Sequence, residues 1–314
     1  MIRIESKIFL VFFISIFTLL LVHNPSNASG YSLSIYPTII KIKANPPALV
    51  KTEVKIKNLS DYPVDLSYVL KPFVADDNNS GQVKYLLYPD YTSKNTDFLK
   101  RVKILEDNQT ISTPIKSGSK IILSPKQEKN LTILIDLPQE EAQEDHYFSI
   151  VFLTQNQDKL DSNYSRLIEG IGTNILVSIG TNQHKALIRE FSTSTFVSEG
   201  PVRFNLKIEN IGKNFIATSG YIIINNIFGQ TVGKIDLRLA NILGKSTLKI
   251  LKDDVVWQEK FLLGTYTAKL YLKYDDSASL YREIKFIAIP IKILAILTIA
   301  GFIIIFIKNR SKTY

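Results

Sequence analysis

Apolar and polar residues alternate with a period of two along most of this chain, and this pattern constrains its fold more than any other feature. Leu131, Ile133 and Ile135 are separated by Thr132 and Leu134, and residues 266–274 repeat the alternation. Period two with one apolar face is typical of half-buried β-strands. No long stretch with a helical period lies between the two ends of the chain, apart from a short turn near residues 97–102. The sequence therefore predicts an all-β fold.

Turn-forming residues separate the alternating segments at short intervals. Examples are Asn45-Pro-Pro, Asn78-Asn-Ser-Gly and Glu199-Gly-Pro. Many short strands joined by polar turns indicate sandwiches or barrels, and the chain is too long for one seven-stranded sandwich. We expect two tandem immunoglobulin-like β-sandwich domains, residues 30–181 and 183–285, joined by a polar link.

The N-terminal segment has the layout of a secretory signal peptide. Two basic residues precede the apolar run Ile8–Val22, and Ser26 and Ala28 provide the small residues of a cleavage site. We assign residues 1–28 to this signal peptide. The alternative is a retained N-terminal anchor, and the chain that follows is exported in both cases.

A second apolar segment, residues 286–307, is long enough to cross a bilayer as one transmembrane helix. Lys292 lies near its outer end, where a lysine can reach the headgroups. The basic tail 308–314 is expected in the cytoplasm. Residues 281–290 lack the motif at which sortase cleaves surface proteins, so we expect the helix to stay in the mature protein. This predicts a single-pass type I protein of the cell membrane, bound to the lipid bilayer through its C-terminal helix, with most of the chain extracellular.

The charge and the cysteine content bear on the class of partner and on the compartment. More than half of the formal net charge of +9 lies in the two terminal segments, and the remaining charges of both signs are interspersed. This distribution gives no support to nucleic-acid binding. The chain has no cysteine, so its domains must be held by hydrophobic cores alone. A cysteine-free exported chain rich in Lys, Ile and Asn fits a bacterial cell surface.

Two glycine motifs resemble phosphate-binding loops only superficially. Gly244-Lys-Ser-Thr would need a glycine five positions earlier, where the chain has Leu239. Gly170-Ile-Gly172 lacks the third glycine of a dinucleotide fingerprint and is interpreted as a turn at a strand edge. No cofactor site is expected from either motif.

Two acidic segments contain residue types that can bind metal ions. Residues 76–81 resemble the start of a calcium loop, but the position of the closing acid is Leu87, so a hairpin tip is the better interpretation. Residues 140–146 hold four acids and His146. We interpret this segment as a solvated charged loop. We predict no metal ligands.

Catalysis has little support in the sequence. Only His146 and His184 are available as imidazole bases after residue 30, and there is no Gly-x-Ser-x-Gly motif for a nucleophile. No pair of carboxylates stands out for glycoside hydrolysis. We therefore predict no catalytic residues and a protein that is not an enzyme.

Aromatic residues gather in one segment that alternates poorly, residues 85–102. Tyr85, Tyr88, Tyr91 and Phe98 are candidate partner contacts there, because tyrosines on loops bury a large area at low entropic cost. The alternative is that these side chains cover the open end of the first sandwich, and the sequence leaves both open.

A family resemblance emerges from the order of short segments along the mature chain. These segments are Lys57-Asn-Leu-Ser-Asp-Tyr, Asn79-Ser-Gly-Gln-Val-Lys-Tyr, Leu123-Ser-Pro-Lys-Gln-Glu, Ile208-Glu-Asn-Ile-Gly, Ile224-Asn-Asn-Ile-Phe-Gly and Leu263-Gly-Thr-Tyr-Thr-Ala. Their order resembles that of the WxL-interacting-protein family of bacterial surface proteins. The resemblance implies two immunoglobulin-like domains and a membrane anchor. It also implies that domain 30–181 is peptidoglycan-binding-like and domain 183–285 is partner-binding-like.

The function expected from these observations is a membrane-anchored cell-surface binding or scaffold protein, with cell-wall glycan or another surface protein as ligand. The alternative is an extracytoplasmic assembly chaperone that acts by β-strand addition. A chaperone would show an exposed apolar edge strand with a cation nearby, whereas a scaffold would have protected edges. A remote alternative is an envelope hydrolase, which would need a cleft with two converging carboxylates.

Overall fold

The structure is a computed structural model of the whole chain. The residues that it describes are 32–87, 90–106, 109–112, 121–154, 170–180, 184–250, 252–274 and 278–310. The expected signal peptide, residues 1–28, lies outside the described residues, and so do residues 181–183 at the expected domain boundary.

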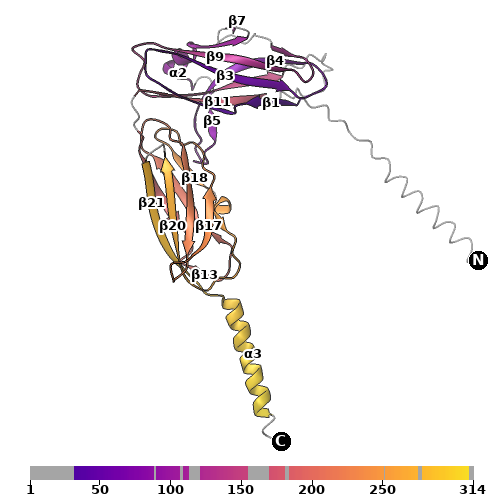
Figure 1. Ribbon diagram of the computed structural model, residues 1–314, viewed down its shortest axis with the longest axis vertical. Coiled ribbons are helices and arrows are strands. Elements are labelled where there is room, and N and C mark those ends of the chain that lie inside the picture. Colours follow the sequence, from indigo (N-terminus) through magenta and orange to yellow (C-terminus); the bar gives the residue numbers. More distant parts are fainter. Residues whose placement is uncertain are drawn as a thin grey trace, which may run out of the picture.

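Two β-sandwiches follow one another along the chain, and a long helix follows the second (Figure 1). The buried residues form two large apolar clusters, one between Ile35 and Ile179 and the other between Ala186 and Ala288. We call the two sandwiches domain 1 and domain 2. The all-β fold of tandem sandwiches is therefore confirmed.

Domain 1 consists of two sheets packed face to face. One has the strand order β1-β3-β9-β6-β7, and the other has the order β2-β11-β10-β4-β5, with β8 also paired to β4. The strands are β1 (Leu33–Tyr36), β2 (Ile39–Ala44), β3 (Ala48–Asn58), β4 (Val64–Ala75), β5 (Val83–Tyr85), β6 (Val102–Glu106), β7 (Gln109–Ser112), β8 (Ile121–Leu123), β9 (Glu128–Leu137), β10 (Asp145–Thr154) and β11 (Gly170–Ile179).

The alternation read from the sequence places the core of domain 1 between these sheets. Leu131, Ile133 and Ile135 are fully buried, and Thr132 and Leu134, which lie between them, face the other side of β9. Burying side chains of this size contributes about 1.5–3 kcal/mol each, which is how a cysteine-free domain can be stable. Gly170 and Gly172 belong to β11 and pair with β10, so the turn expected there is wrong, although a strand does begin at that point.

Domain 2 repeats this two-layer plan. One sheet has the order β13-β21-β20-β16-β17, and the facing strands form the sheets β12-β15-β18 and β14-β19. The strands are β12 (Ala186–Ser192), β13 (Phe196–Val197), β14 (Val202–Arg203), β15 (Asn205–Asn210), β16 (Thr218–Asn225), β17 (Thr231–Leu237), β18 (Thr247–Ile250), β19 (Val256–Trp257), β20 (Gly264–Tyr274) and β21 (Ala278–Ala288), with a short 3-10 helix η1 (Lys252–Asp254).

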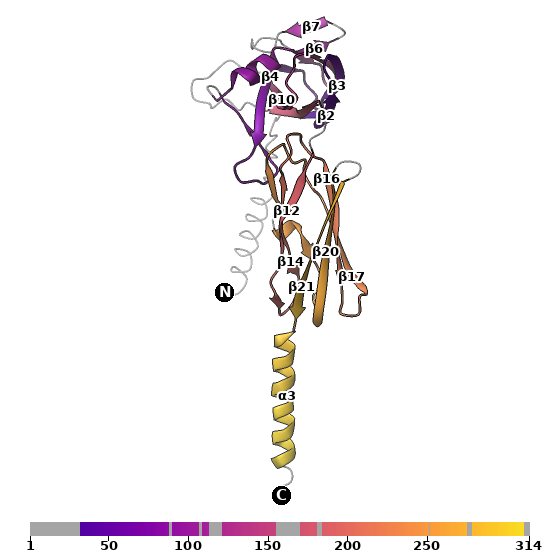
Figure 2. The same cartoon turned by 90° about the vertical axis from the view of Figure 1, so that its left-hand side faces the viewer.

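In both domains the chain begins in one sheet and crosses to the other. In domain 1, β1 pairs antiparallel with β3, and β2 then runs parallel to the last strand, β11. In domain 2, β12 pairs antiparallel with β15, and β13 then runs parallel to the last strand, β21. As a result, β2 lies at an edge of its sheet, beside domain 2 (Figure 2).

The segment between Tyr85 and Val102, expected to be an irregular loop, contains the short helix α2 (Ser93–Leu99). Thr92 caps this helix: its hydroxyl accepts a hydrogen bond from the Asn95 backbone N–H at 3.2 Å, and the Asn95 side chain accepts one from the Thr92 N–H. Such a reciprocal capping box stabilises the first turn of a helix. The helix is too short to give a periodic signal in the sequence.

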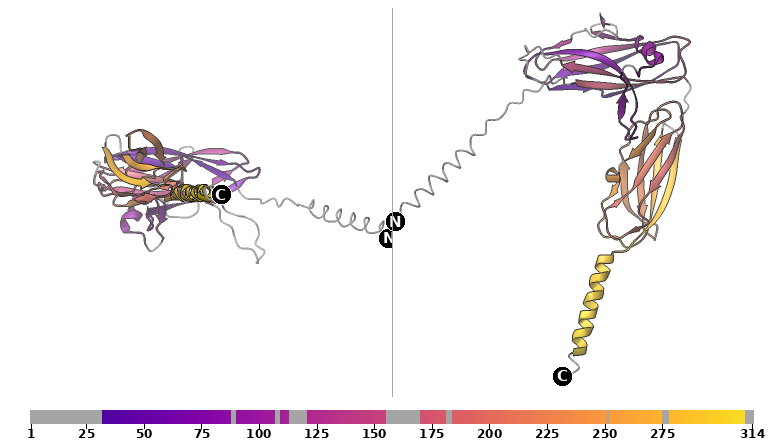
Figure 3. Two further views of the ribbon diagram at one scale, coloured as in Figure 1. Left: turned by 90° about the horizontal axis from the view of Figure 1, so that it is seen from below. Right: turned by 180° about the vertical axis from the view of Figure 1, so that it is seen from behind.

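The C-terminal helix α3 (Ile291–Arg310) leaves domain 2 at the end away from domain 1 (Figure 3, right). Among the described residues it is the one helix long and apolar enough to cross a membrane; its window Ile291–Lys308 has a mean hydropathy of 2.4 and no buried residue. The helix starts at Ile291 rather than at Phe286 as expected. Phe286 is the reason, because it ends strand β21 in the core of domain 2 and is 1% exposed.

Candidate functional site

The junction between the two domains is built from a face of one sheet and the loops at one end of the other sandwich. Phe73 of β4 and Leu176 of β11 point outward from domain 1 and pack against Phe215 and Leu243 of domain 2. All four side chains are buried. Burial of an apolar cluster at this contact favours a fixed angle between the domains.

The carboxylate of Asp145 connects the two domains through hydrogen bonds. Its Oδ1 accepts a hydrogen bond from Asn214 Nδ2 at 2.6 Å, and its Oδ2 accepts one from the Phe215 backbone N–H at 2.5 Å. Asn214 Nδ2 also lies 2.8 Å from the Ser178 hydroxyl. Hydrogen bonds to a carboxylate in a partly buried setting are strong and directional, so this network stabilises the domain junction.

Tyr147 adds a second connection across the junction. Its hydroxyl donates to Asp145 Oδ2 at 2.6 Å and accepts from the Gly244 backbone N–H at 3.0 Å. Burial raises the pKa of this hydroxyl well above its usual range, and the charge of Asp145 raises it further. Gly244 is required here because a Cβ would lie 2.0 Å from the Lys213 carbonyl oxygen. The Gly244-Lys-Ser-Thr motif is therefore a tight turn at the junction.

The hairpin between β4 and β5 reaches across to domain 2, and its tip was expected from residues 76–81. Asp76 stabilises this tip by accepting hydrogen bonds from the Ser80 backbone N–H at 2.9 Å and from its hydroxyl at 3.0 Å. The Asn79 carbonyl oxygen accepts a hydrogen bond from the Lys249 N–H of β18 at 2.6 Å. The acidic residue of the calcium-like motif thus organises a contact between domains.

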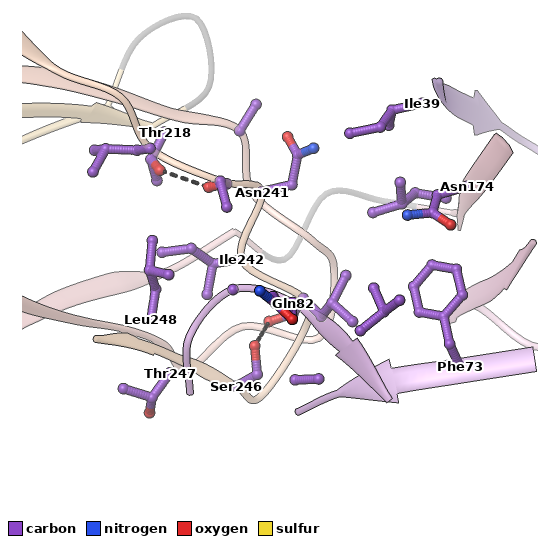
Figure 4. Close-up of a pocket in the computed structure, with 18 of the residues that line it drawn as sticks. Ile39, Phe73, Gln82, Asn174, Thr218, Asn241, Ile242, Ser246, Thr247 and Leu248 are labelled. Atoms are coloured by element: carbon purple, nitrogen blue, oxygen red, sulfur yellow. Dashed lines mark hydrogen bonds between the residues drawn. The ribbon is translucent and has the colours of Figure 1, made fainter. Parts of the chain in front are cut away.

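A groove of about 280 Å³ lies beside this junction and is walled by both domains (Figure 4). Domain 1 contributes side chains from β2, β4 and β11 and the hairpin residues 81–83. Domain 2 contributes the start of β16 and the segment 239–248. The lining combines apolar side chains with amide and hydroxyl groups such as those of Asn174, Asn241 and Thr218. Apolar walls with a few placed polar groups are typical of binding sites.

Lys41 is the one charged side chain among the described residues that line this groove. It is exposed and makes no ion pair with another described residue. It lies on β2, which pairs with β11 alone among the described strands and so leaves one edge unpaired. Ile39, 43% exposed on the same strand, also lines the groove. The groove thus combines an apolar wall, an unpaired cation and a sheet edge.

The four aromatic candidates do not form one surface. Phe98 is 3% exposed and packs in the core of domain 1, so its assignment as a partner contact is wrong; it covers the open end of the sandwich instead. Tyr85 is 39% exposed and contacts Phe73 edge-on, close to the groove. Tyr91 is half-buried, and burial raises the pKa of its hydroxyl. Tyr88 lies outside the described residues.

The charged segment 140–146 is only in part the solvated loop that we expected: Glu140 is exposed, but the side chains of Glu141 and His146 are buried. His146 is 5% exposed, its ring stacks on Phe98 with centroids 3.8 Å apart, and its Nε2 lies 3.3 Å from Glu141. Glu141 is buried as well and pairs with Arg101. Burial, helped by the nearby positive charge of Lys94 and opposed by Glu144, lowers the pKa of His146 to about 4. Two acids of this segment pair with cations on or next to α2: Glu144 with Lys94, and Glu141 with Arg101.

No sequence pattern indicates the groove directly. Lys41 was visible only as one of the polar residues that alternate with Ile40 and Ile42, and Phe215 only as one more apolar residue. What makes them part of a site is the angle between the domains, which depends on contacts between residues far apart in the chain. In the part of the chain that the structure describes, no group of three residues with metal-binding side chains occurs.

No protein-family model and no curated protein matches the sequence. Among solved structures, the class 5 fimbriae chaperone CfaA is 11% identical, with 80% of this chain and 98% of that chain covered and a TM-score of 0.40. The Escherichia coli chaperone DraB is 13% identical over 82% and 97%, with a TM-score of 0.37. The Pseudomonas aeruginosa chaperone CupB2 is 9% identical over 81% and 100%, also with a TM-score of 0.37. No functional conclusion follows from likenesses at this level.

Proposed function

We propose that this chain is an extracytoplasmic binding protein, tethered to the membrane by α3, that takes an extended segment of another exported protein into the groove between its domains. The observation that carries the proposal is Lys41, which pairs with no described carboxylate, on an edge of β2 that no other described strand covers, in a groove walled by both domains.

An extended polypeptide satisfies all three features of this groove. Its backbone can pair with the free N–H and C=O groups of an edge strand such as β2, as in recognition by β-strand addition. Its apolar side chains can pack against the exposed Ile39. A carboxylate, from an acidic residue or a chain terminus, can pair with Lys41. Binding rather than hydrolysis fits this groove, because its described lining residues include no Asp, Glu or His.

The membrane tether rests on the composition and exposure of α3. A fully exposed apolar helix of this length is costly in water and matches the hydrocarbon thickness of a bilayer. Three positive charges near the C-terminus, on Lys308, Arg310 and Lys312, favour a cytoplasmic location for that end. In this topology the groove faces the outside of the cell, where exported proteins and cell-wall glycan are available.

Site-specific crosslinking tests the proposal, since a chain without cysteine accepts a single labelled position cleanly. A benzophenone attached to Asn241→Cys in the groove should crosslink to an exported protein in intact cells. The same probe at Gln230→Cys, on an exposed turn far from the groove, should not. Lys41→Gln should weaken the crosslink at least tenfold, whereas Lys43→Gln, on the same strand but outside the groove, should not. Crosslinks to glycan would instead support the peptidoglycan role implied by the family resemblance.

A second candidate, an assembly chaperone acting by strand addition, is favoured by the contrast between edge strands. In domain 2 the edge strand β12 is covered by Arg282, whose Nη1 lies 3.1 Å from the Ile188 carbonyl oxygen, and the edge strand β18 is covered by the Asn79 carbonyl. β2 has no such cover among the described residues, and it carries the exposed Ile39 and a cation. This is the combination expected of a chaperone.

The two roles differ in the fate of the partner. A scaffold keeps its partner, so a pulse-labelled partner should remain crosslinkable through Asn241→Cys after a long chase. A chaperone passes its partner on, so the crosslink should decay while the partner appears in a surface assembly that lacks this chain. Persistence of the crosslink would rule out the chaperone role, and decay with transfer would rule out the scaffold role.

A further inference from the structure

Four exposed apolar side chains lie on two loops at the end of domain 2 from which α3 departs. Ile227 and Phe228, in the turn between β16 and β17, are 70% and 83% exposed. Phe261 and Leu263, in the loop before β20, are 56% and 61% exposed. We call these four residues the apolar collar. Exposed apolar side chains that gather at one end of a domain mark a surface that contacts something apolar.

Strand pairing places both loops at this end. Asn225, just before the first turn, pairs with Thr267 near the start of β20, and Gly264 pairs with Ala288 at the end of β21. Figure 2 shows the lower ends of β17 and β20, where both strands begin, close to the level at which α3 starts.

The first loop has a fixed shape that holds its apolar residues outward. Asn226 Oδ1 accepts hydrogen bonds from the backbone N–H groups of Phe228 and Gln230, both at 3.0 Å, and Asn225 Nδ2 donates to the Gly229 carbonyl at 2.8 Å. Gly229 has φ +80°, which a residue with a side chain rarely adopts. Ile227 and Phe228 therefore cannot fold back onto the domain without breaking this turn.

The second loop, before β20, is held in place by one buried residue. Leu262 is 1% exposed and belongs to the core of domain 2, so the residues on either side of it, Phe261 and Leu263, are turned to the surface. The Leu263 backbone N–H also lies 3.2 Å from the Tyr266 hydroxyl.

The connection between domain 2 and α3 is short and stiff. Only Ile289 and Pro290 separate β21 from the helix, a length of about 7 Å at most. The Ile289 N–H donates to the Val197 carbonyl at 2.9 Å, and Lys292 Nζ lies 2.6 Å from Glu199. If α3 spans the bilayer, this end of domain 2 has to rest on the membrane surface.

We infer that the apolar collar inserts into the headgroup and upper acyl region of the outer leaflet and holds domain 2 upright on the membrane. This inference rests on the proposed membrane tether. The charged neighbours Glu259 and Lys260 cancel, so the insertion is apolar rather than electrostatic in character. An upright domain 2 would keep the groove between the domains a constant height above the membrane.

Spin labels on single cysteines in the full-length chain, reconstituted in nanodiscs, test the depth of the collar. A label at Phe228→Cys should be more accessible to oxygen than to a water-soluble nickel complex. A label at Tyr36→Cys, exposed on domain 1, should show the reverse. A label at Ile299→Cys in α3 should be the deepest. A lipid-buried Ile299 label with a fully aqueous Phe228 label overturns the collar alone, whereas an aqueous Ile299 label overturns the tether.

A second measurement keeps the inference testable without a label in the collar. Energy transfer from a dye at Tyr36→Cys to labelled headgroups reports the height of domain 1. In a background with Phe228→Ser and Leu263→Ser, this height should become lower and more broadly distributed. Leu49→Ser, which removes a side chain 69% exposed on domain 1, should leave it unchanged. An unchanged height of domain 1 in the collar variant would overturn the inference. In the spin-label experiment, a label at Phe228→Cys that is shielded from the nickel complex only after envelope proteins are added would overturn it too.

Discussion

Asn58 and Asn210 occupy equivalent positions in the two domains and make the same hydrogen bonds. Each is the last residue of a strand, β3 or β15, and each is fully buried. Asn58 Nδ2 donates to the Tyr62 carbonyl at 2.8 Å, and Asn210 Nδ2 donates to the Asn214 carbonyl at 2.8 Å. In both cases Oδ1 accepts the backbone N–H two residues further on.

Each side chain also satisfies carbonyl groups from a distant segment. Asn58 Nδ2 lies 3.3 Å from the Leu123 carbonyl oxygen, and Asn210 Nδ2 lies 3.0 Å from those of both Ile242 and Leu243. The second contact is part of the domain junction, because the Leu243 side chain packs there. One amide thus connects a strand end, the following loop and a distant segment in each domain.

Replacing either asparagine by alanine should destabilise the domain that contains it. Several buried carbonyls and one N–H would lose their partner, and leaving such groups unsatisfied costs about 1–3 kcal/mol each, so we expect a loss on the order of 3 kcal/mol. Denaturant unfolding of Asn58→Ala and Asn210→Ala measures this loss. Asn130→Ala, an exposed position on β9, should change stability by less than about 0.5 kcal/mol. An equal loss of unfolding free energy in all three variants would contradict the structural role of the two buried asparagines.

Both asparagines stood in the short segments that carry the family resemblance, yet their role could not be inferred from the sequence. A buried asparagine at a strand end has the same local pattern as an exposed one in a turn. The carbonyls that it binds, such as that of Leu123, come from far along the chain. The alternation by contrast predicted β9 and β20, because period two depends only on neighbouring residues.

Phe98 shows why the candidate contacts were harder to predict. Its segment alternates poorly because it holds a helix of only seven residues, and such a helix has too few turns for a clear period. Only the packing of α2 against the end of the sandwich reveals that Phe98 is buried while Tyr85 stays half-exposed. The groove could not be predicted from the sequence either, because its walls come from two domains that meet only in the folded chain.

Truncation of Phe98 should therefore act on stability. Phe98→Ala removes a ring that stacks on His146 and contacts Phe148, and such core truncations cost about 3–5 kcal/mol. Tyr85→Ala, at a half-exposed edge contact, should cost no more than about 1 kcal/mol. Thermal and denaturant unfolding measure both values. If Phe98→Ala kept wild-type stability but lost partner capture, Phe98 would be a contact residue after all.

Removal of the Asp145 carboxylate should loosen the angle between the domains. Asp145→Ala leaves the Tyr147 hydroxyl, the Asn214 amide and the Phe215 N–H without their shared acceptor. We expect a destabilisation of about 2–4 kcal/mol and a broader distribution of interdomain distances.

Double electron–electron resonance between labels at Tyr36→Cys and Gln230→Cys measures this distribution. Asp136→Ala, an exposed acid on β9, serves as the matched control and should leave the distribution narrow. A narrow distribution in Asp145→Ala as well would mean that the apolar cluster around Phe73 and Leu176 fixes the angle alone.

The buried His146 should make domain 1 less stable in mild acid. Its pKa is about 4 in the folded protein and about 6.5 when unfolded, so between these values the unfolded chain binds a proton that the folded protein does not. The contribution of His146 is complete above pH 6.5 and is lost as the pH falls toward 4, by on the order of 3 kcal/mol in all. Glu141 offers little compensation to a charged imidazolium, because Arg101 already pairs with it.

His146→Phe isolates this contribution, since it keeps the ring that stacks on Phe98 and removes the titrating group. The difference in unfolding free energy between pH 7 and pH 4.5 should be about 2–3 kcal/mol smaller in the variant than in the wild-type protein. Other acids titrate equally in both proteins and cancel in this comparison. Parallel pH profiles for the two proteins would mean that His146 is already solvated or charged in the folded state, and the assignment of a neutral buried ring beneath α2 would be wrong.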